Sequence, residues 1–355
     1  MDMEQNEKKP KRIVIKIGTN LLTNNLIGLK GEFIQKIASE IAGLKKEGHE
    51  VIIVTSGAIG AGSLELGIKK TRDVEVRQAL AAVGQGSVMG AYHTAFSKHN
   101  IHVAQILITY EDFSDRVKYL NLRNCLIKLL VWDVIPVINE NDPVSTKEIG
   151  SSFGDNDRLS ALVACKIDAD LLVILTDIDG LYDNNPKTHK DAKLVRNVSA
   201  ITKEIERAAG KSGSELAIGG MSAKVQAAKI VMEAGILLVI ANGMKKDILR
   251  NVLSGQEGTC FSPEKKISNK ERWIKFAAPK GKIAINQCAV DVLKRGKSSL
   301  LAVGIDRAEG KFEKNDVIEI NDIAKGVVDY SSEDLEKLKG QKGKVAVKKE
   351  NLVIV

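Results

Sequence analysis

Two lysines stand where the sequence offers sites for a phosphate group. Lys16 lies near the end of the apolar run Ile13–Ile17 and is followed by Gly18, where backbone N–H groups could approach an anion. Much later, a glycine pair leads into a predicted helix that carries Lys224 in its first turn. Glycines at a helix N-terminus together with a lysine favour binding of phosphate oxygens. A lysine on a strand edge is the other interpretation of Lys16.

Clusters of Asp and Asn provide the groups that a charged amino acid needs. One is Asn139-Glu140-Asn141-Asp142-Pro143 after an apolar run, and another is Gly154-Asp155-Asn156-Asp157 before a predicted helix. Asn and Asp also favour turns and helix caps, which is the alternative for each cluster alone. Together they supply carboxylates that accept from an α-ammonium group and amides that donate to a carboxylate.

Common nucleotide-binding fingerprints do not account for these segments. The small-residue loop Thr55–Gly62 could hold an anion at a helix N-terminus or make a tight turn, but Glu65 stands where a dinucleotide fingerprint has its third glycine. Gly210-Lys211-Ser212 is not a P-loop, because Ile205 replaces the glycine required five residues earlier. Any phosphate site in this chain must therefore be built without a dinucleotide fingerprint or a P-loop.

Apolar runs of strand length alternate with amphipathic stretches over most of the chain. The runs are almost continuous in apolar residues, as expected for strands covered on both faces. The predicted strands are Ile13–Ile17, Val51–Thr55, His102–Ile108, Val134–Asn139, Leu171–Thr176 and Ile236–Ala241. The predicted helices are Glu32–Glu47, Asp73–Ser97, Asp115–Val131, Asp155–Lys166 and Ser222–Ala234. This alternation indicates an α/β fold with a mostly parallel sheet sandwiched by helices, in which ligands gather where strands end.

The pattern changes after about residue 262. The Lys-rich segment Ser262–Lys270 is predicted to be a linker, and short strand-like pieces follow it. These pieces are Ile283–Ile285, Leu300–Val303, Val317–Ile320 and Val345–Val347. Because 355 residues exceed what one core usually organises, we expect two domains, residues 1–262 and a small β-rich domain of residues 271–355.

Composition excludes several classes of protein. With 44% hydrophobic and 28% charged residues the chain is neither disordered nor fibrous. Its apolar runs fall well short of the ~20 residues of a membrane span, and Met1–Arg12 lacks the apolar core of an export signal, so we expect a cytoplasmic protein. Four scattered cysteines suggest neither a disulfide framework nor zinc. The net charge of +8 is spread along the chain, as on a solvated basic surface.

At this point the sequence resembles a known family, the glutamate 5-kinases of the amino-acid-kinase fold. Seven segments occur in the order seen in that family, and the resemblance extends over essentially the whole chain. They are Lys16-Ile17-Gly18-Thr19, Thr55-Ser56-Gly57-Ala58-Ile59, Gln78–Gln85, Asn139-Glu140-Asn141-Asp142, Gly154-Asp155-Asn156-Asp157, Leu175-Thr176-Asp177 and Gly219-Gly220-Met221. The tail resembles the PUA domain that many bacterial members carry.

The resemblance implies transfer of the ATP γ-phosphoryl group to the side-chain carboxylate of L-glutamate, the first step of proline biosynthesis. It also implies a role for each matching residue. Those matched to catalysis are Lys16 and Lys224 at the transferring group and Asp157, which would orient the lysines. Those matched to the glutamate site are Ser56, Asp142 and Asn156, with Asn139 and Asp155 as neighbours. Those matched to the ATP site are Lys16, Thr176, Asp177, Ile218, Gly219, Gly220, Met221, Ser222, Ala223 and Lys224.

The implied reaction needs positioning and neutralisation of charge more than it needs proton transfer. A glutamate side chain has a reference pKa of about 4.3 and is already ionised, so we nominate no general base. ATP and Mg²⁺ are the expected cofactors, with Mg²⁺ and lysines stabilising the charge of the transferring group. No side chain is nominated as a metal ligand, and the five histidines lie outside these motifs.

One segment departs from the family pattern. Members usually read Gly-Thr-Gly-Gly-Met-x-Thr-Lys, whereas this chain has Ala217-Ile218 before Gly219 and Ala223 before Lys224. Two hydroxyls that could touch phosphate or Mg²⁺ are therefore missing. We expect backbone contacts and Lys224 to hold the nucleotide without them.

Two alternatives remain at the level of sequence. Aspartate, acetylglutamate, carbamate and uridylate kinases share the fold, but the two Asn/Asp clusters and the tail fit glutamate 5-kinases better. RNA binding is the other alternative, because PUA domains elsewhere contact RNA, yet the tail has few aromatic residues and only a modest excess of positive charge. The resemblance also implies a homo-oligomer and inhibition by proline, which the sequence itself does not show.

Overall fold

The structure, a computed structural model, divides into two compact units. The first comprises residues up to 113 and 117–266, and the second comprises residues 267–355 with the short segment 114–116. The residues that it describes are 11–24, 28–69, 73–109, 111–114, 116–145, 156–184, 186, 188–189, 191–210, 220–263, 268–277, 279–295 and 298–354.

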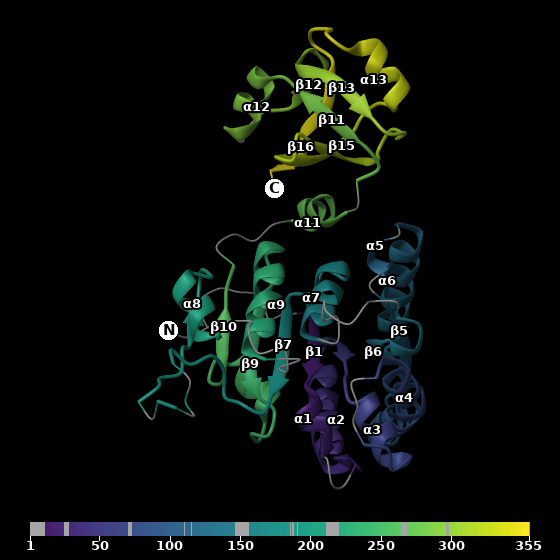
Figure 1. Cartoon of the computed structure of the whole chain (residues 1–355), viewed down its shortest axis with the longest axis vertical. Coiled ribbons are helices and arrows are strands. Elements are labelled where there is room, and N and C mark those ends of the chain that lie inside the picture. Colours follow the sequence, from purple (N-terminus) through teal and green to yellow (C-terminus); the bar gives the residue numbers. More distant parts are fainter. Residues whose placement is uncertain are drawn as a thin grey trace. The chain divides into compact units, whose positions relative to one another are not determined.

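An eight-stranded sheet forms the middle layer of the first unit (Figure 1). Neighbouring strands are parallel except for β9 and β10, which confirms the predicted mostly parallel sheet. In spatial order the strands are β5 (Val103–Ile108), β6 (Ile135–Glu140), β4 (Glu50–Val54), β1 (Arg12–Ile17), β7 (Leu171–Thr176), β9 (Leu237–Asn242), β10 (Thr259–Phe261) and β8 (Asn197–Val198). The six strands expected from the sequence are all present, each within a residue or so of its predicted ends.

Side chains of the central strand β1 alternate between two layers of helices. Ile13, Ile15 and Ile17 belong to the apolar core beneath α2 (Gly31–Lys46), α4 (Val74–Ser97) and α10 (Ile248–Leu253). Because successive strand residues face opposite sides, Val14 and Lys16 point to the other layer. That layer contains α7 (Asn156–Lys166) and α9 (Met221–Glu233), which pack against one another and against the sheet. The alternation therefore places Lys16 under α7.

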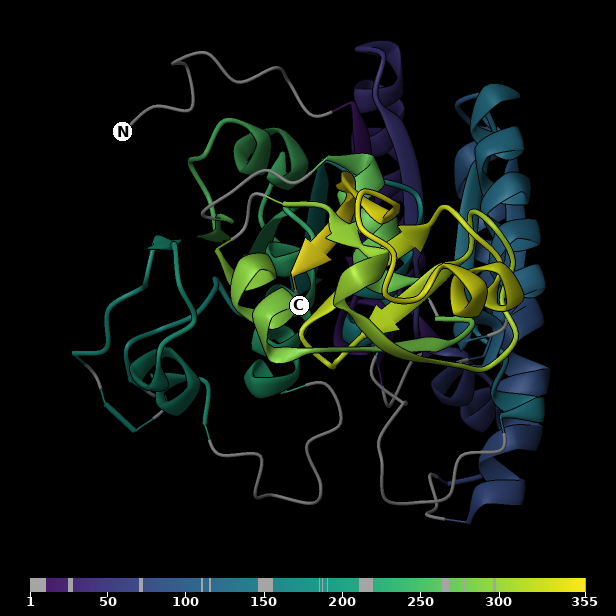
Figure 2. The same cartoon turned by 90° about the horizontal axis from the view of Figure 1, so that it is seen from above.

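Further helices, strands and turns complete the first unit. In both views α4 and α6 lie at the β5 edge of the sheet (Figures 1 and 2). None of the described helices is long and apolar enough to cross a bilayer. The remaining elements are α1 (Thr19–Leu22), β2 (Thr23–Asn24), β3 (Gly28–Leu29), α3 (Ala58–Glu65), α5 (Glu111–Ser114), α6 (Arg116–Val131), the 3-10 turn Asp142–Val144 and α8 (Lys203–Ala208).

The second unit is built on a six-stranded, mostly antiparallel sheet with its own apolar core. In spatial order its strands are β12 (Leu300–Leu301), β16 (Val345–Ile354), β15 (Ala324–Val328), β14 (Val317–Ile320), β11 (Lys282–Ile285) and β13 (Ile305–Glu309). Its helices are α11 (Asn269–Phe276), α12 (Gln287–Lys294) and α13 (Ser332–Leu338), with a 3-10 turn at Ala302–Gly304.

Two expectations for this second unit need correction. The predicted strand Leu300–Val303 stops at Leu301, because the pairing with β16 shifts register there and the chain enters the 3-10 turn. The expected linker is shorter than Ser262–Lys270, since Ser268 caps α11 in a reciprocal capping box with Glu271. Two hydrogen bonds at a helix start thus give the last linker residues a defined structure.

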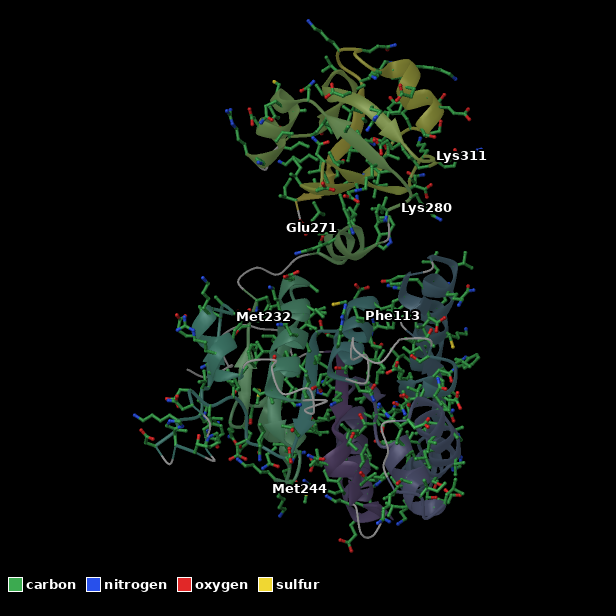
Figure 3. All side chains as sticks on the ribbon, in the orientation of Figure 1. Phe113, Met232, Met244, Glu271, Lys280 and Lys311 are labelled. Carbon is green, nitrogen blue, oxygen red and sulfur yellow. The ribbon has the colours of Figure 1, made fainter. Side chains whose placement is uncertain are left out.

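A buried lysine near the end of α7 lies between two aromatic rings. Lys166 is only 2% exposed, and its Nζ lies 3.9 Å from the centroid of the Tyr119 ring and 4.6 Å from that of Phe113, which Figure 3 labels. Burial lowers the pKa of Lys166 to about 7, against the opposing charge of Asp112. The rings favour a cation, but the loss of hydration outweighs them.

We predict that Lys166→Met stabilises the protein more at pH 6 than at pH 9. The unfolded lysine keeps its ordinary pKa near 10.5 while the folded one titrates near 7, so the wild-type stability rises with pH between these values. The slope is at most about 1.4 kcal/mol per pH unit, so the advantage of the variant shrinks by up to about 2.7 kcal/mol between pH 7 and 9. Urea denaturation at pH 6, 7.5 and 9 measures it; an advantage independent of pH would contradict the lowered pKa.

Candidate active site

A buried carboxylate holds two lysine ammonium groups at the centre of the first unit. Lys16 Nζ lies 2.5 Å from Asp157 Oδ1, and Lys224 Nζ lies 2.9 Å from Asp157 Oδ2. Asp157 is fully buried, and each lysine is only 4% exposed. The three residues, here called the charge triad, come from β1, α7 and α9, so long-range folding assembles them.

Local structure explains why each member of the charge triad points inward. Lys16 lies on the face of β1 against which α7 packs. Asp157 is in the first turn of α7, where the helix dipole favours a negative charge. Lys224 lies in the first turn of α9, four residues after the N-cap Gly220. Two helix starts therefore meet above the middle strand, next to its carboxyl end.

The electrostatics of the charge triad favour an ionised aspartate. Burial alone would raise the pKa of Asp157, but the charges and hydrogen bonds of Lys16 and Lys224 hold it below its ordinary value. One carboxylate then faces two ammonium groups, and the formal charge of the triad is +1. A buried site with one excess positive charge attracts a phosphate or carboxylate.

A row of amide groups lies beside the charge triad. Asn156 directly precedes Asp157, and its Nδ2 donates to Thr55 O at 2.5 Å, to Ser56 Oγ at 2.9 Å and to Asn139 Oδ1 at 3.0 Å. Asn139 Nδ2 donates in turn to Gln85 Oε1 at 2.9 Å. The structure thus brings together Ser56, Asn139 and Asn156, three of the residues that the resemblance matched to a glutamate site.

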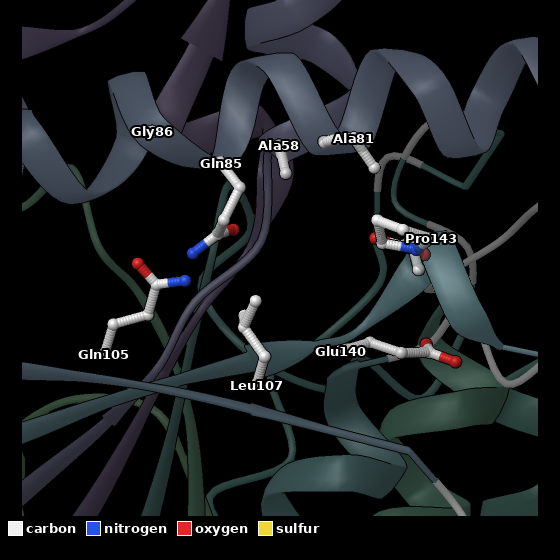
Figure 4. Close-up of a pocket in the computed structure, with 10 residues that line it drawn as sticks. Ala58, Ala81, Gln85, Gly86, Gln105, Leu107, Glu140 and Pro143 are labelled. Atoms are coloured by element: carbon white, nitrogen blue, oxygen red, sulfur yellow. The ribbon is translucent and has the colours of Figure 1, made fainter.

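A cavity of about 330 Å³ opens next to this row, between α4 and strands β5 and β6 (Figure 4). Its lining residues are Ala58, Ala81, Ala82, Gln85, Gly86, Gln105, Leu107, Glu140, Asp142 and Pro143. Burial raises the pKa of Asp142 to about 6, although the charge of Arg77 opposes the shift. The cavity therefore combines two carboxylates with amide groups, as a site for an amino acid would.

The loop after β7 is braced by polar contacts from neighbouring segments. Asn20 Nδ2 donates to Asp177 Oδ2 at 3.1 Å, and Thr176 Oγ1 donates to Asp177 Oδ1 at 3.1 Å. Burial acts to raise the pKa of Asp177, but these hydrogen bonds and the charge of Lys224 hold it below its ordinary value. Thr176 and Asp177 thus belong to a rigid loop at the same edge of the sheet as the charge triad.

Some expected site residues cannot be placed, and others were missed. Asp155, Ile218 and Gly219 lie outside the described residues, whereas Gly220, Met221, Ser222 and Ala223 form the start of α9. Sequence reasoning missed Gln85 and Glu140 as cavity residues. Glu140 could have been found, because it lies inside the Asn139–Asp142 cluster; Gln85 ends the Gln78–Gln85 segment of the resemblance, but it lies inside a helix and no strand end marked it as a cavity residue.

Comparison with protein families and with curated proteins identifies the fold and the family of this chain. Residues 11–242 match the amino acid kinase family, and residues 281–349 match the PUA domain. The glutamate 5-kinase of Methanosarcina barkeri is 50% identical over 343 residues, covering 93% of this chain and 89% of that protein. The chain belongs to the glutamate 5-kinases of the amino acid kinase family. The glutamate 5-kinase of Caldanaerobacter subterraneus is 45% identical, covering 93% of this chain and 91% of that protein.

Solved structures of other kinases share the fold of this glutamate 5-kinase. A carbamate kinase from Giardia lamblia bound to AMP-PNP matches with a TM-score of 0.52 at 18% identity, covering 72% of this chain and 99% of that one. A UMP kinase from Bacillus anthracis matches with a TM-score of 0.50 at 17% identity, covering 73% and 98%. At such identities the likeness concerns the fold alone.

We predict that Asp157→Asn lowers the free energy of unfolding by about 3 kcal/mol at pH 7, because two buried lysines lose their counter-charge. Urea denaturation measures the effect. Since the folded pKa of Asp157 is lowered, its stabilisation is present above the unfolded pKa, near 3.8, and is lost as pH falls through the folded value.

Two further variants test whether the loss comes from uncompensated charge. Asp133→Asn removes an exposed carboxylate 2.6 Å from Lys45 and should cost less than about 1 kcal/mol. Adding Lys224→Met to Asp157→Asn should recover part of the stability, because one orphaned charge disappears. If the double variant is no more stable than Asp157→Asn, the charge triad is not the source of the loss.

Proposed function

We propose that this protein transfers the γ-phosphoryl group of ATP to the side-chain carboxylate of L-glutamate and produces L-glutamyl 5-phosphate. The charge triad is the observation that carries this proposal. It sets two lysine ammonium groups in a buried position, next to an amide row and an acidic cavity that suit the acceptor. The identity of 44–50% to proteins named glutamate 5-kinase supports the choice of acceptor.

The proposed mechanism works through the placement of charge. The acceptor carboxylate needs no general base, because it is ionised at neutral pH. Lys16 and Lys224 would contact the oxygens of the transferring group, where negative charge spreads in the transition state. Asp157 is a positioning residue: its two oxygens hold the lysines in place before the substrates arrive. Ammonium groups that are already oriented do not have to reorganise during the reaction.

ATP is proposed to lie across the starts of α9 and the loop after β7. Thr176, Asp177, Ile218 and Gly219 would line the nucleotide, and the N-terminus of α9 from Gly220 to Lys224 would face its phosphates. Mg²⁺ would enter with ATP and supply charge neutralisation, held by phosphate oxygens and water as in many kinases. Both oxygens of Asp157 already contact lysines, so its role is to balance them.

The glutamate is proposed to lie between the charge triad and the cavity. Its side-chain carboxylate would point to the lysines, with Ser56 and Asn156 along its length. Asp142 would accept from the α-ammonium group, and Asn139 and Asp155 would be neighbours. This orientation gives the two ends of the substrate opposite electrostatic surroundings, positive at the reacting carboxylate and negative at the amine.

Other family properties extend the proposal. We propose a homo-oligomer in the cytoplasm that acts in proline biosynthesis and takes proline as a feedback inhibitor. The catalytic domain is proposed to span residues 1–262 and the PUA-like domain residues 271–355. Catalysis is assigned to the first of these, since the charge triad and the cavity both lie in it.

Hydroxylamine trapping of an acyl phosphate is the direct test. Purified protein with MgATP should give hydroxamate with glutamate but not with aspartate, acetylglutamate or carbamate. Lys224→Ala should lower kcat/KM by about 100-fold or more, the usual effect of losing one group that stabilises transition-state charge.

Lys229→Ala removes an exposed lysine from the same helix and should leave the rate unchanged. Hydroxamate with another acceptor in place of glutamate would overturn the acceptor assignment. Equal rates for the wild type and Lys224→Ala would overturn the role of that lysine.

Asp142 should give the reaction a pH dependence. Its pKa of about 6 means that the carboxylate needed for the α-ammonium group is lost as pH falls through 6. We predict that kcat/KM for glutamate falls nearly tenfold per pH unit below that value, while Asp142→Asn has a low and nearly flat profile between pH 5 and 7.5. A profile of the same shape in both proteins would show that another group titrates.

A further inference from the structure

The side-chain amide of Gln85 presents a buried donor that no described residue uses. Gln85 is 8% exposed, its Oε1 accepts from Asn139, and its Nε2 has no hydrogen-bond partner among the described residues. Figure 4 shows the side chain pointing from α4 into the cavity, toward Gln105 and Leu107 of β5. A buried donor without an acceptor is costly, so its presence in a cavity calls for an explanation.

A carbonyl group fixes which atom of Gln85 faces the cavity. The oxygen of Thr55 can only accept, so the atom that Asn156 turns toward it must be the donor Nδ2. The same nitrogen faces Asn139, which must present its oxygen and therefore turns its own Nδ2 toward Gln85. Gln85 in turn presents Oε1 to Asn139. The chain of partners thus fixes the orientation of all three amides, and it leaves Gln85 Nε2 on the side of the cavity.

Close packing of two helices brings Gln85 to this position. A Cβ atom on Gly84 would lie 2.0 Å from Ala58 O, and one on Gly62 would lie 2.0 Å from Leu80 O. The backbones of α3 and α4 therefore touch, and larger residues would force them apart. This contact sets the height of Gln85 above the sheet, beside Asn139 at the end of β6.

The other polar groups of the cavity indicate which acceptor the donor takes. Asp142 and Glu140 also line it and suit an ammonium group, while the amide nitrogen suits a carboxylate. An ammonium and a carboxylate on one carbon are the head group of an α-amino acid. We propose that Gln85 Nε2 donates to the α-carboxylate of glutamate and so selects α-amino acids; this inference rests on the proposed function and adds a specificity-determining residue to it.

The inference separates three acceptors that share the reacting carboxylate. 4-Aminobutyrate lacks the α-carboxylate, and glutarate lacks the amine. Gln85→Met removes the donor at similar size, so it should lower kcat/KM for glutamate by about 10- to 100-fold, mainly through KM, since the contact is to a charged group. The same change should lower the value for glutarate similarly and that for 4-aminobutyrate by a clearly smaller factor, which reflects only the loss of the Oε1 contact to Asn139.

Two other variants complete the experiment. Gln85→Glu keeps an oxygen for Asn139 but puts a negative charge in the cavity, so it should impair glutamate more than Gln85→Met does. Gln78→Met changes another half-buried glutamine of α4, whose Nε2 donates to Ser145 O at 3.3 Å, and should change no acceptor by more than about threefold. Rates come from ADP release, and an acceptor that turns over too slowly is measured by its inhibition constant against glutamate.

Each outcome supports or overturns one claim. If wild-type protein makes no acyl phosphate from glutamate, the proposed function fails. If the wild type is active but Gln85→Met impairs glutamate and 4-aminobutyrate by the same factor, Gln85 only supports the structure and the inference fails. A loss that is clearly larger for the two acceptors with a second carboxylate than for 4-aminobutyrate is the result that we expect.

Discussion

One buried carboxylate between two lysines is the constraint on which the rest of the first unit depends. Two ammonium groups in one buried place repel each other, and removing them from water is costly. Asp157 offsets both effects with one oxygen for each lysine. It can do so only if a central strand and the starts of two helices meet at one point. The order of the sheet, with β1 between β4 and β7, provides that meeting point.

The site must also distinguish the two carboxylates of its acceptor, which are chemically alike. The charge triad attracts either one, so attraction alone cannot orient glutamate. Orientation requires a second region of opposite charge, and in the proposed binding mode the cavity lined by Glu140 and Asp142 is that region. The amide row lies between the two regions and carries no net charge, so it can fix distances without favouring either end. Its hydrogen bonds link the segment after β4 to β6, α7 and α4.

Much of this arrangement could be predicted from the sequence, because strand ends carry a local signal. Leu171–Leu175 is apolar and buried throughout, and the polar residues that end or follow such strands include Ser56, Thr176 and Asp177. Gln85 could not be predicted in this way, since it lies in the interior of α4 and its place depends on the contact of Gly62 with α4. In the second unit, β13 was missed because Asp306, Arg307 and Glu309 hide its period.

The departure at Ala223 shows that contacting a phosphate and placing the Lys224 ammonium group depend on different residues. A hydroxyl at this position could contact phosphate, but it would not be needed to place Lys224. The ammonium group of Lys224 is held by Asp157 at 2.9 Å, and its backbone is held by α9 behind Gly220. Both supports come from outside residue 223. Under the proposed function, alanine in place of the family's threonine therefore leaves the position of the Lys224 ammonium group unchanged.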